Sequence, residues 1–287
     1  MGGLKGRDLL SMTDLSAEET LALLQLAADL KQGKIKPVCQ KNLGLLFYKA
    51  STRTRVSFFA AMTQLGGQVI DLNTGSMQIG RGEPLQDTAR ILDGYLDVLA
   101  IRTFAHADVE TYAKYARMPI INALTDLEHP CQVLADFQTI QECFGQLAGL
   151  KLAYCGDGNN MAHSLLLGCA TVGMDIAIAC PANFMPDLQI VNQAKSIAAI
   201  QGTQVLVTQS AQAAASEAHI VYTDVWASMG QESESDVRIP LFQPYQVNAE
   251  LLTLADPNSI VLHCLPAHRG EEITDDVLEG TRSRVWD

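Results

Sequence analysis

The alternation of apolar and amphipathic segments is the feature that most constrains this fold. Short apolar runs and amphipathic stretches follow one another along the whole chain, and Gly, Pro, Asp and Asn mark the joins. This order is typical of parallel sheets whose strands are connected by crossover helices. We predict strands near 43–48, 68–72, 97–103, 119–123, 151–156, 175–180, 203–208, 219–225 and 259–264. We predict helices near 16–32, 54–65, 84–95, 107–116, 130–144, 160–172, 186–200 and 246–254.

The number of predicted strands indicates two domains. They are too many for one sheet in a chain of 287 residues that is 48% hydrophobic, so we expect two separate cores. The stretch EHPCQVLADFQTIQECFGQLAG has the length and periodicity of a helix that joins two lobes. We place the boundary within this helix, with domains at 1–133 and 134–287. The predicted fold is α/β: two doubly wound domains, each with a mainly parallel sheet flanked by helices, joined by an interdomain helix.

Charge and cysteine usage exclude several classes of protein. The formal net charge is −12 and the isoelectric point is about 4.9, which argues against nucleic acid or an anionic membrane as the main partner. Seven cysteines, an odd number, form no C-x-x-C pair and lie mostly in apolar runs, as reduced thiols do. We see no targeting or membrane segment and predict a cytoplasmic protein.

The segment FYKASTRTRVSF, residues 47–58, is locally basic and rich in hydroxyl side chains, although the whole chain is acidic. It follows an apolar strand-like run and opens a predicted helix, where free backbone N–H groups and the helix dipole favour an anion. The hydroxyls of Ser51, Thr52 and Thr54 add donors, and Arg53 supplies a planar fork suited to phosphate oxygens. An ordinary Ser/Thr helix cap beside surface arginines is the alternative, and spacing alone does not decide between them.

Four ordered segments resemble one known family. The frame F-x-K-x-S-T-R-T resembles the carbamoyl phosphate signature of the aspartate/ornithine carbamoyltransferase family. RGEPLQDTARIL (81–92), HPCQVLADF (129–137) and HCLPAHRGEE (263–272) agree with that family in order and spacing. The resemblance extends from about residue 8 to the last residue. It implies transfer of a carbamoyl group from carbamoyl phosphate to an amine.

A second cluster is expected around the start of the interdomain helix. His129 and Gln132 are three apart beside Pro130, so they project from one helix face, and Arg102 ends a predicted strand. Together they could stabilise the oxyanion of acyl transfer, although a histidine before proline is also common as a cap or surface residue. The resemblance assigns the following residues to carbamoyl phosphate: Ser51, Thr52, Arg53, Thr54, Gln78, Arg102, His129, Gln132 and Leu265.

The second half of the chain carries a Gly-Asp-Gly turn in YCGDGNNMAHSLLLG, residues 154–168. Taken alone it suggests a dinucleotide site. However, the third glycine is absent, and no acidic residue ends a strand about 20 residues on, where a ribose contact would require it. The resemblance instead gives Asn160 to the α-carboxylate of an amino acid, which an amide can bind without adding charge.

Two further segments bear on the acceptor. TDVWASMGQE (223–232) resembles the signature of ornithine-specific members, which gives Asp224 to the α-ammonium group and lets Ser228 and Met229 close over the substrate. Met229 as a simple gap filler is the alternative. We expect 226–240 to be a polar loop. The resemblance also places Cys264 beside the δ-amine and the Leu265 carbonyl near the carbamoyl nitrogen.

The sequence therefore predicts carbamoyl transfer from carbamoyl phosphate to the δ-amine of L-ornithine, giving citrulline. The predicted catalytic residues are Arg53, Arg102, His129, Asp224 and Cys264. No cofactor or metal is expected, because positioning and electrostatics carry this chemistry. We do not expect His263 or His268 to be metal ligands, because no clustered carboxylate or thiol pair is predicted to accompany them. The competing hypotheses are another amine acceptor, a non-catalytic binding protein of this fold, and a nicotinamide-dependent dehydrogenase.

Two expectations rest on the resemblance alone. Members of the family form trimers or multiples of trimers, and the 76–82 loop of one subunit reaches its neighbour's site, with Gln78 as the candidate contact. Members also continue past RSRVWD with an Ala-Glu-Asn-Arg segment and a last helix that returns to the first domain. The chain is then either part of a longer protein or works with one phosphate-binding arginine fewer.

Overall fold

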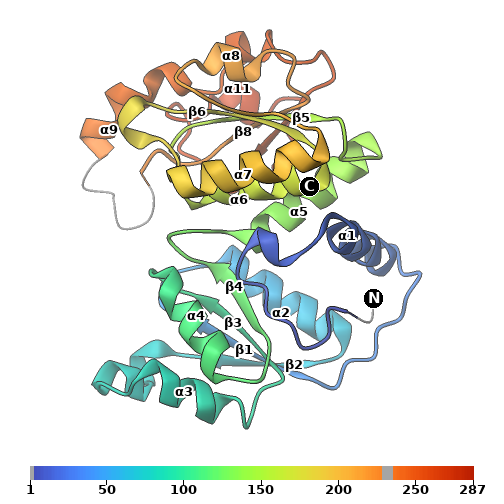
Figure 1. The fold of residues 1–287 in the computed structure, drawn as a ribbon, viewed down its shortest axis with the longest axis vertical. Helices are drawn as coiled ribbons and strands as arrows, with labels where there is room; N and C mark the ends of the chain where they lie inside the picture. The colour runs from blue at the N-terminus through green and yellow to red at the C-terminus, as the bar shows by residue number, and fades with distance from the viewer. Residues whose placement is uncertain (1–2, 228–234) are drawn as a thin grey trace. The chain divides into compact units, whose positions relative to one another are not determined.

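The computed structural model describes residues 3–227 and 235–287. The chain divides into two compact units, Met1–Leu134 and Ala135–Asp287, and the division falls inside helix α5 (Pro130–Phe144). Each unit has a wholly parallel sheet with helices on both faces (Figure 1). The predicted fold class is confirmed.

The first unit has a four-stranded sheet in the order β2-β1-β3-β4. Its strands are β1 (Asn42–Phe47), β2 (Gln68–Leu72), β3 (Val98–Arg102) and β4 (Ile120–Leu124). Its helices are α1 (Ala17–Lys31), α2 (Arg53–Leu65), α3 (Leu85–Leu92) and α4 (His106–Tyr115). Three short 3-10 helices, η1 (Met12–Asp14), η2 (Thr74–Ser76) and η3 (Gln78–Arg81), complete the described elements.

Strand β1 is buried on both faces, as a central parallel strand must be. Leu45 and Phe47 pack with Met62 of α2 on one side, whereas Leu46 packs with Tyr112 of α4 on the other. The alternation follows from the two-residue period of a strand. Each fully buried side chain of this size contributes about 1.5–3 kcal/mol through the hydrophobic effect. This packing fixes the end of β1, and with it the turn that follows.

The second unit has a five-stranded sheet in the order β7-β6-β5-β8-β9. Its strands are β5 (Lys151–Cys155), β6 (Asp175–Ala179), β7 (Val205–Thr208), β8 (Ile220–Thr223) and β9 (Ile260–His263). Its helices are α6 (Asn160–Val172), α7 (Leu188–Gln201), α8 (Ala211–Ala215), α9 (Ser235–Phe242), α10 (Ala249–Leu252) and α11 (Asp275–Leu278), with 3-10 helices η4 (Ala182–Phe184) and η6 (Gln243–Tyr245). Helices α6 and α7 cover one sheet face, and α8 and α11 cover the other (Figure 1).

The strand orders define one switch point in each sheet. In the first unit the direction in which successive strands are added to the sheet reverses between β1 and β3, and in the second unit it reverses between β5 and β8. Loops that leave two such strands diverge to opposite faces, so a crevice for ligands opens at the carboxyl ends of the strands. The segments that follow β1 and β3, and those that follow β5 and β8, are therefore the places to look for function.

Every predicted strand overlaps an observed one, but the helices were predicted less completely. The sequence missed α8 and α11, which span only five and four residues and cannot show a helical period. The expectation of a loop over 226–240 is wrong for its last part, because α9 begins at Ser235 and includes Pro240. The predicted helix 246–254 shortens to α10, capped by the Asn248 side chain.

The helices that the structure describes include none with the length and apolar character needed to cross a membrane.

Candidate functional site

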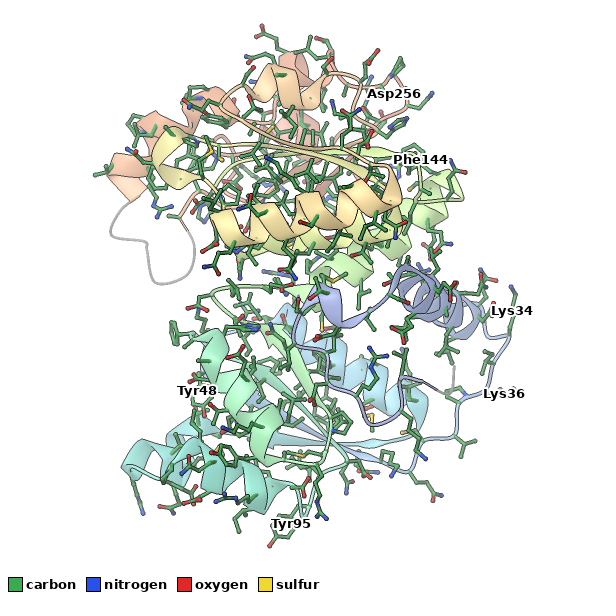
Figure 2. The ribbon with its side chains drawn as sticks, viewed as in Figure 1. Lys34, Lys36, Tyr48, Tyr95, Phe144 and Asp256 are labelled. Carbon is green, nitrogen blue, oxygen red and sulfur yellow. The ribbon has the colours of Figure 1, made fainter. Side chains whose placement is uncertain are left out.

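The turn after β1 leaves the start of α2 open. Tyr48 directly follows the strand (Figure 2), and α2 begins at Arg53 with Thr52 as its N-cap residue. The Thr52 side chain makes no capping hydrogen bond, so the capping alternative does not describe this residue. Thr52 and Arg53 are exposed and Ser51 is half-buried. The first-turn N–H groups of α2 are thus available to an anion beside a guanidinium group.

Arg102 joins this turn from the neighbouring strand. It is the last residue of β3, and the parallel register sets it opposite Phe47 at the end of β1. Its side chain is buried to 8% exposure, and Nη1 donates a hydrogen bond of 3.1 Å to Thr54 Oγ1. The switch point therefore brings together two residues that are 48 positions apart.

Arg55, the second arginine of the motif, has a different environment. Its Nη1 pairs with the Asp71 carboxylate, and its guanidinium lies 5.1 Å from the Phe47 ring centroid. These contacts hold α2 against β1 and β2. The two arginines of the motif therefore serve different purposes, which their spacing did not reveal.

His129 immediately precedes α5 and is half-buried. Desolvation, and secondly the charge of Arg102, lower the pKa of His129 to about 3. The imidazole is therefore neutral at pH 7 and can donate one hydrogen bond without carrying charge. Gln132 lies in the first turn of α5, and its backbone N–H donates to the His129 carbonyl at 3.2 Å.

A local positive field surrounds these groups within an acidic protein. Lys49 Nζ lies 4.2 Å from the Phe104 ring centroid, and burial followed by the charge of Arg102 lowers the pKa of Lys49. Arg102 therefore disfavours a second positive charge at both Lys49 and His129. An anion that binds beside Arg102 would relieve this repulsion.

Gln78 is the one predicted carbamoyl phosphate residue of the first unit that lies apart from this group. It begins η3 and is exposed. Within the described residues its side chain has no hydrogen bond to the turn at 51–54. The structure of one chain thus does not bring Gln78 to the other predicted residues.

In the second unit, Asp224 is the centre of a polar cluster at the β5/β8 switch point. The Cys264 thiol donates to Asp224 Oδ1 at 2.9 Å, and Asn159 Nδ2 donates to Oδ2 at 3.0 Å. The backbone N–H of Val225 also donates to Oδ1, at 2.8 Å. Asp224 is 8% exposed and follows β8 directly, while Cys264 follows β9.

The protonation state of Cys264 follows from this cluster. Burial, then the charge of Asp224, raises the pKa of the Cys264 thiol well above its usual value. The sulfur is therefore protonated at neutral pH and acts as a donor to the carboxylate. It is not a thiolate nucleophile.

Asn160 and Asn159 have distinct positions at the start of α6. Asn160 is the first helical residue and half-buried, whereas Asn159 is the N-cap, whose Oδ1 accepts from the N–H groups of Met161 and Ala162. The sequence pointed to Asn160 and missed Asn159. Ordinary capping preference was the signal that could have identified Asn159.

The Gly-Asp-Gly turn has a structural explanation. A Cβ on Gly158 would lie 2.3 Å from the Pro186 nitrogen and 2.5 Å from the Phe184 carbonyl oxygen. Glycine is therefore required because another backbone segment passes against it, and the turn does not need a dinucleotide to account for it.

A buried ion pair beside this turn was not predicted. Arg238 of α9, 6% exposed, donates to Asp157 Oδ2 at 2.7 Å and to the Trp226 carbonyl at 2.9 Å. Its guanidinium also lies 4.7 Å from the Phe184 ring centroid. Burial is the main cause that raises the pKa of Asp157, and the Arg238 partner opposes it. No local sequence pattern connects residues 81 positions apart.

The reason given for excluding a metal near His263 was wrong. The fold brings Asp224, His263 and Cys264 together, with one potential ligand atom from each within 4.8 Å of the others. His268 likewise lies beside Glu271 and Glu272. Both ring nitrogens of His263 are already hydrogen-bonded, however, to Glu272 at 3.0 Å and to the Leu265 N–H at 2.8 Å. The absence of a metal from the site stays a prediction.

Leu265 lies one residue after Cys264, is half-buried and has a positive φ of 57°. Ser228 and Met229 lie outside the described residues. The predicted roles of these three residues stay predictions.

Each unit thus carries a different chemistry at its switch point. The first presents arginines, hydroxyls and a neutral histidine, and the second presents a carboxylate, a thiol and amides. Together they define a two-domain α/β protein suited to bind an anion and an amine-bearing ligand.

Comparison with family models gives the particular class. Residues 7–142 match the carbamoyl-P binding domain, and residues 148–287 the Asp/Orn binding domain, of aspartate/ornithine carbamoyltransferase. The chain belongs to the aspartate/ornithine carbamoyltransferase family.

Individual relatives agree over nearly the whole length. The chain is 66% identical to the ornithine carbamoyltransferase of Synechocystis sp. over 99% of this chain and 92% of that protein. It is 64% identical to that of Nostoc punctiforme over 100% and 94% of the two chains. The crystal structure of ornithine carbamoyltransferase from Gloeobacter violaceus aligns with TM-score 0.88 at 57% identity, covering 97% and 92%. The Pyrococcus furiosus enzyme aligns with TM-score 0.94 at 46% identity, covering 99% and 92%.

Proposed function

We propose that this protein transfers the carbamoyl group of carbamoyl phosphate to the δ-amine of L-ornithine, giving citrulline and phosphate in arginine metabolism. The observation that carries the proposal is the agreement of both domains with one family, together with relatives at 61–66% identity that are all ornithine carbamoyltransferases.

We assign the phosphate and carbamoyl groups to the first unit. The open start of α2 with Ser51, Thr52 and Arg53 binds the phosphate, and Arg102 adds a second guanidinium. The hydrogen bond from Arg102 to Thr54 holds both groups at the switch point. This assignment is supported by the exposed N-terminal turn of α2 and by the charge that Arg102 imposes on its neighbours.

We assign polarisation of the carbonyl to three donors, namely Thr54, Arg102 and His129, with Gln132 beside them. As the amine attacks, negative charge develops on the carbonyl oxygen, and fixed donors stabilise it without reorganisation. The low pKa of His129 supports this role, because a neutral imidazole donates a hydrogen bond over the whole physiological range. The C–N bond forms and the C–O bond to phosphate breaks.

We assign the amino acid to the second unit. Asp224 pairs with the α-ammonium group, Asn160 with the α-carboxylate, and Ser228 and Met229 close over the chain. Cys264 lies beside the δ-amine, and the Leu265 carbonyl accepts from the carbamoyl nitrogen. A primary amine with a pKa of about 10.4 is almost fully protonated at pH 7, so the site must favour its neutral form. The thiol–carboxylate pair of Cys264 and Asp224 is proposed to steer that proton.

The assembly and the compartment are also proposals. We infer a trimer, or a multiple of trimers, in which Gln78 contributes to the neighbouring subunit's site. The exposed position of Gln78 supports this view. We infer a reducing, cytoplasmic environment, because all seven cysteines are free thiols.

The test is formation of the carbamoylated product and release of phosphate from carbamoyl phosphate with four acceptors in parallel: L-ornithine (which gives citrulline), aspartate, N-acetylornithine and putrescine. We expect turnover with ornithine and at least about 100-fold lower kcat/KM with the others, which corresponds to about 2.7 kcal/mol of discrimination. Preference for another acceptor would overturn the ornithine assignment, and inactivity with all four would favour the binding-protein hypothesis. Tight binding of a nicotinamide cofactor would revive the dehydrogenase hypothesis.

A further inference from the structure

A buried hydrogen-bonded pair, His263 and Glu272, adjoins the proposed ornithine residue Cys264 and has no role in the mechanism above. His263 Nε2 and Glu272 Oε1 are 3.0 Å apart, and both side chains are completely buried. The same carboxylate oxygen accepts the backbone N–H of His268 at 2.6 Å. Among the residues that the structure describes, none forms a hydrogen bond with Glu272 Oε2.

The contacts of His263 fix its tautomer. The Leu265 backbone N–H lies 2.8 Å from His263 Nδ1, and an amide N–H can only donate. Nδ1 must therefore present a lone pair, so the single ring proton of the neutral imidazole sits on Nε2 and is donated to Glu272. The direction of the two hydrogen bonds is therefore fixed. The Leu265 N–H donates to His263, and His263 donates to Glu272.

These hydrogen bonds hold an unusual backbone conformation at Leu265. Leu265 has a φ of 57°, in the left-handed region that residues with a Cβ rarely adopt. Its N–H is held by His263 Nδ1, while the N–H of His268 is held by Glu272. One carboxylate thus secures both ends of the segment 265–268.

We propose that His263, whose tautomer Glu272 fixes, is a positioning residue that sets the Leu265 backbone, and thereby its carbonyl, for the carbamoyl nitrogen. The inference rests on the proposed function, because it deepens the role assigned to Leu265. His263 and Glu272 touch no substrate in this scheme. Their contribution is orientation, for which a misplacement of about 1 Å costs about 100-fold in rate.

The matched variants separate the two hydrogen bonds of His263. Glu272→Gln keeps an amide oxygen in place of Oε1 and strands no charge, so it serves as the background. Within it, His263→Asn places Oδ1 where Nδ1 stood and keeps the acceptor for Leu265. His263→Gln reaches toward residue 272 and loses that acceptor. Both changes remove the imidazole.

We expect E272Q to stay within about threefold of wild-type kcat. Relative to E272Q, the kcat of H263N/E272Q should fall by less than about tenfold and that of H263Q/E272Q by about 100-fold. Binding of inorganic phosphate, which probes the first unit, should be unchanged in all three. A purely structural role predicts equal kcat losses that track the fall in melting temperature, and a chemical role for the imidazole predicts that both double variants fail alike. Either result would overturn the proposal.

A measurement on the wild-type protein does not depend on how the variants fold. The ¹⁵N chemical shifts of the His263 ring should report a proton on Nε2 and none on Nδ1. A proton on Nδ1 would refute the proposed hydrogen bonds from Leu265 to His263 and from His263 to Glu272. A wild-type protein that forms no citrulline would overturn the proposed function, and the role of His263 with it. An active wild-type protein whose variants do not behave as expected would overturn only the role of His263.

Discussion

At the residue scale, side chains of the same type differ in role because their interaction partners differ. Arg53 is exposed at the start of α2, whereas Arg55 pairs with Asp71 and lies over Phe47. Two cysteines show the same contrast: Cys155 is a buried small hydrophobe, while Cys264 donates to Asp224. Environment, and not residue type, assigns the chemistry.

The two arginines give a matched prediction. Arg53→Leu should lower kcat by about 1000-fold or more, because it removes a charge-assisted phosphate contact in the proposed site. Arg55→Leu should keep activity and cost at most about 1 kcal/mol, as expected for a partly exposed ion pair. Citrulline assays and thermal unfolding of both variants provide the measurement. Near-normal turnover of Arg53→Leu would refute the phosphate assignment.

The pKa of His129 gives a prediction about pH. Because desolvation penalises the charged imidazole, the folded protein should keep His129 neutral as the pH falls from 7 to 5, through the usual histidine range. The unfolded chain would take up this proton, so His129 contributes stability above about pH 6.5 that is lost as the pH falls toward 3. NMR of the ring, assigned with His129→Asn, should show no titration between pH 7 and 5. A midpoint near 6.5 would contradict the prediction.

At the scale of elements, the order of strands brings the proposed residues together. Parallel register places Arg102 opposite Phe47, so the ends of β1 and β3 deliver the Arg102 side chain to Thr54. In the second unit, the same arrangement of β5 and β8 brings the N-cap of α6 to Asp224. Helix starts and strand ends at a switch point supply N–H groups and side chains to one place.

Two helix caps test this relation. Asn159 caps α6 and also donates to Asp224, whereas Asp187 caps α7 through Gln189 and has no contact with Asp224. Replacement of either by Ala should cost about 1 kcal/mol of stability through the lost cap. Only Asn159→Ala should also raise the KM for ornithine, by about tenfold, because it frees the Asp224 carboxylate to rotate. Equal KM values for the two variants would argue against this link.

At the scale of the whole molecule, an acidic chain contains a cationic site. The net charge of −12 repels anions at long range, so Arg53, Arg102 and Lys49 must act at short range, within a Debye length of about 8 Å. The exposed Gln78 lies outside this set in one chain. We propose that Gln78 acts in the site of a second copy.

Subunit mixing tests that role. If Gln78 acts in a neighbouring site, Gln78→Ala and Arg53→Leu trimers should each be nearly inactive, but reassembled mixtures should regain activity in sites that combine intact Arg53 and Gln78. Light scattering should give a multiple of three times the chain mass of 31.1 kDa. Mixtures no more active than the average of their parents, or a monomeric protein, would exclude the shared site.

The sequence by itself determined the strands, the parallel architecture and the family. Local period and apolar runs specify the strands and their parallel arrangement, because they depend on residues close together in the chain. The family resemblance rests instead on four ordered motifs. Short helices such as α8 and α11 carry too few residues to show a period, so only packing against the sheet reveals them. The family resemblance likewise predicted roles for Arg53, Arg102 and Asp224, and these roles stay predictions.

Only the tertiary structure decided the partners of these residues. The contacts of Asp224 with Asn159 and Cys264, of Asp157 with Arg238, and of His263 with Glu272 join different elements or loops. No local pattern encodes them, because hydrogen bonds and desolvation depend on distances that folding alone creates. For the same reason the charge states of His129 and Cys264 are properties of the folded units and not of the motifs that contain them.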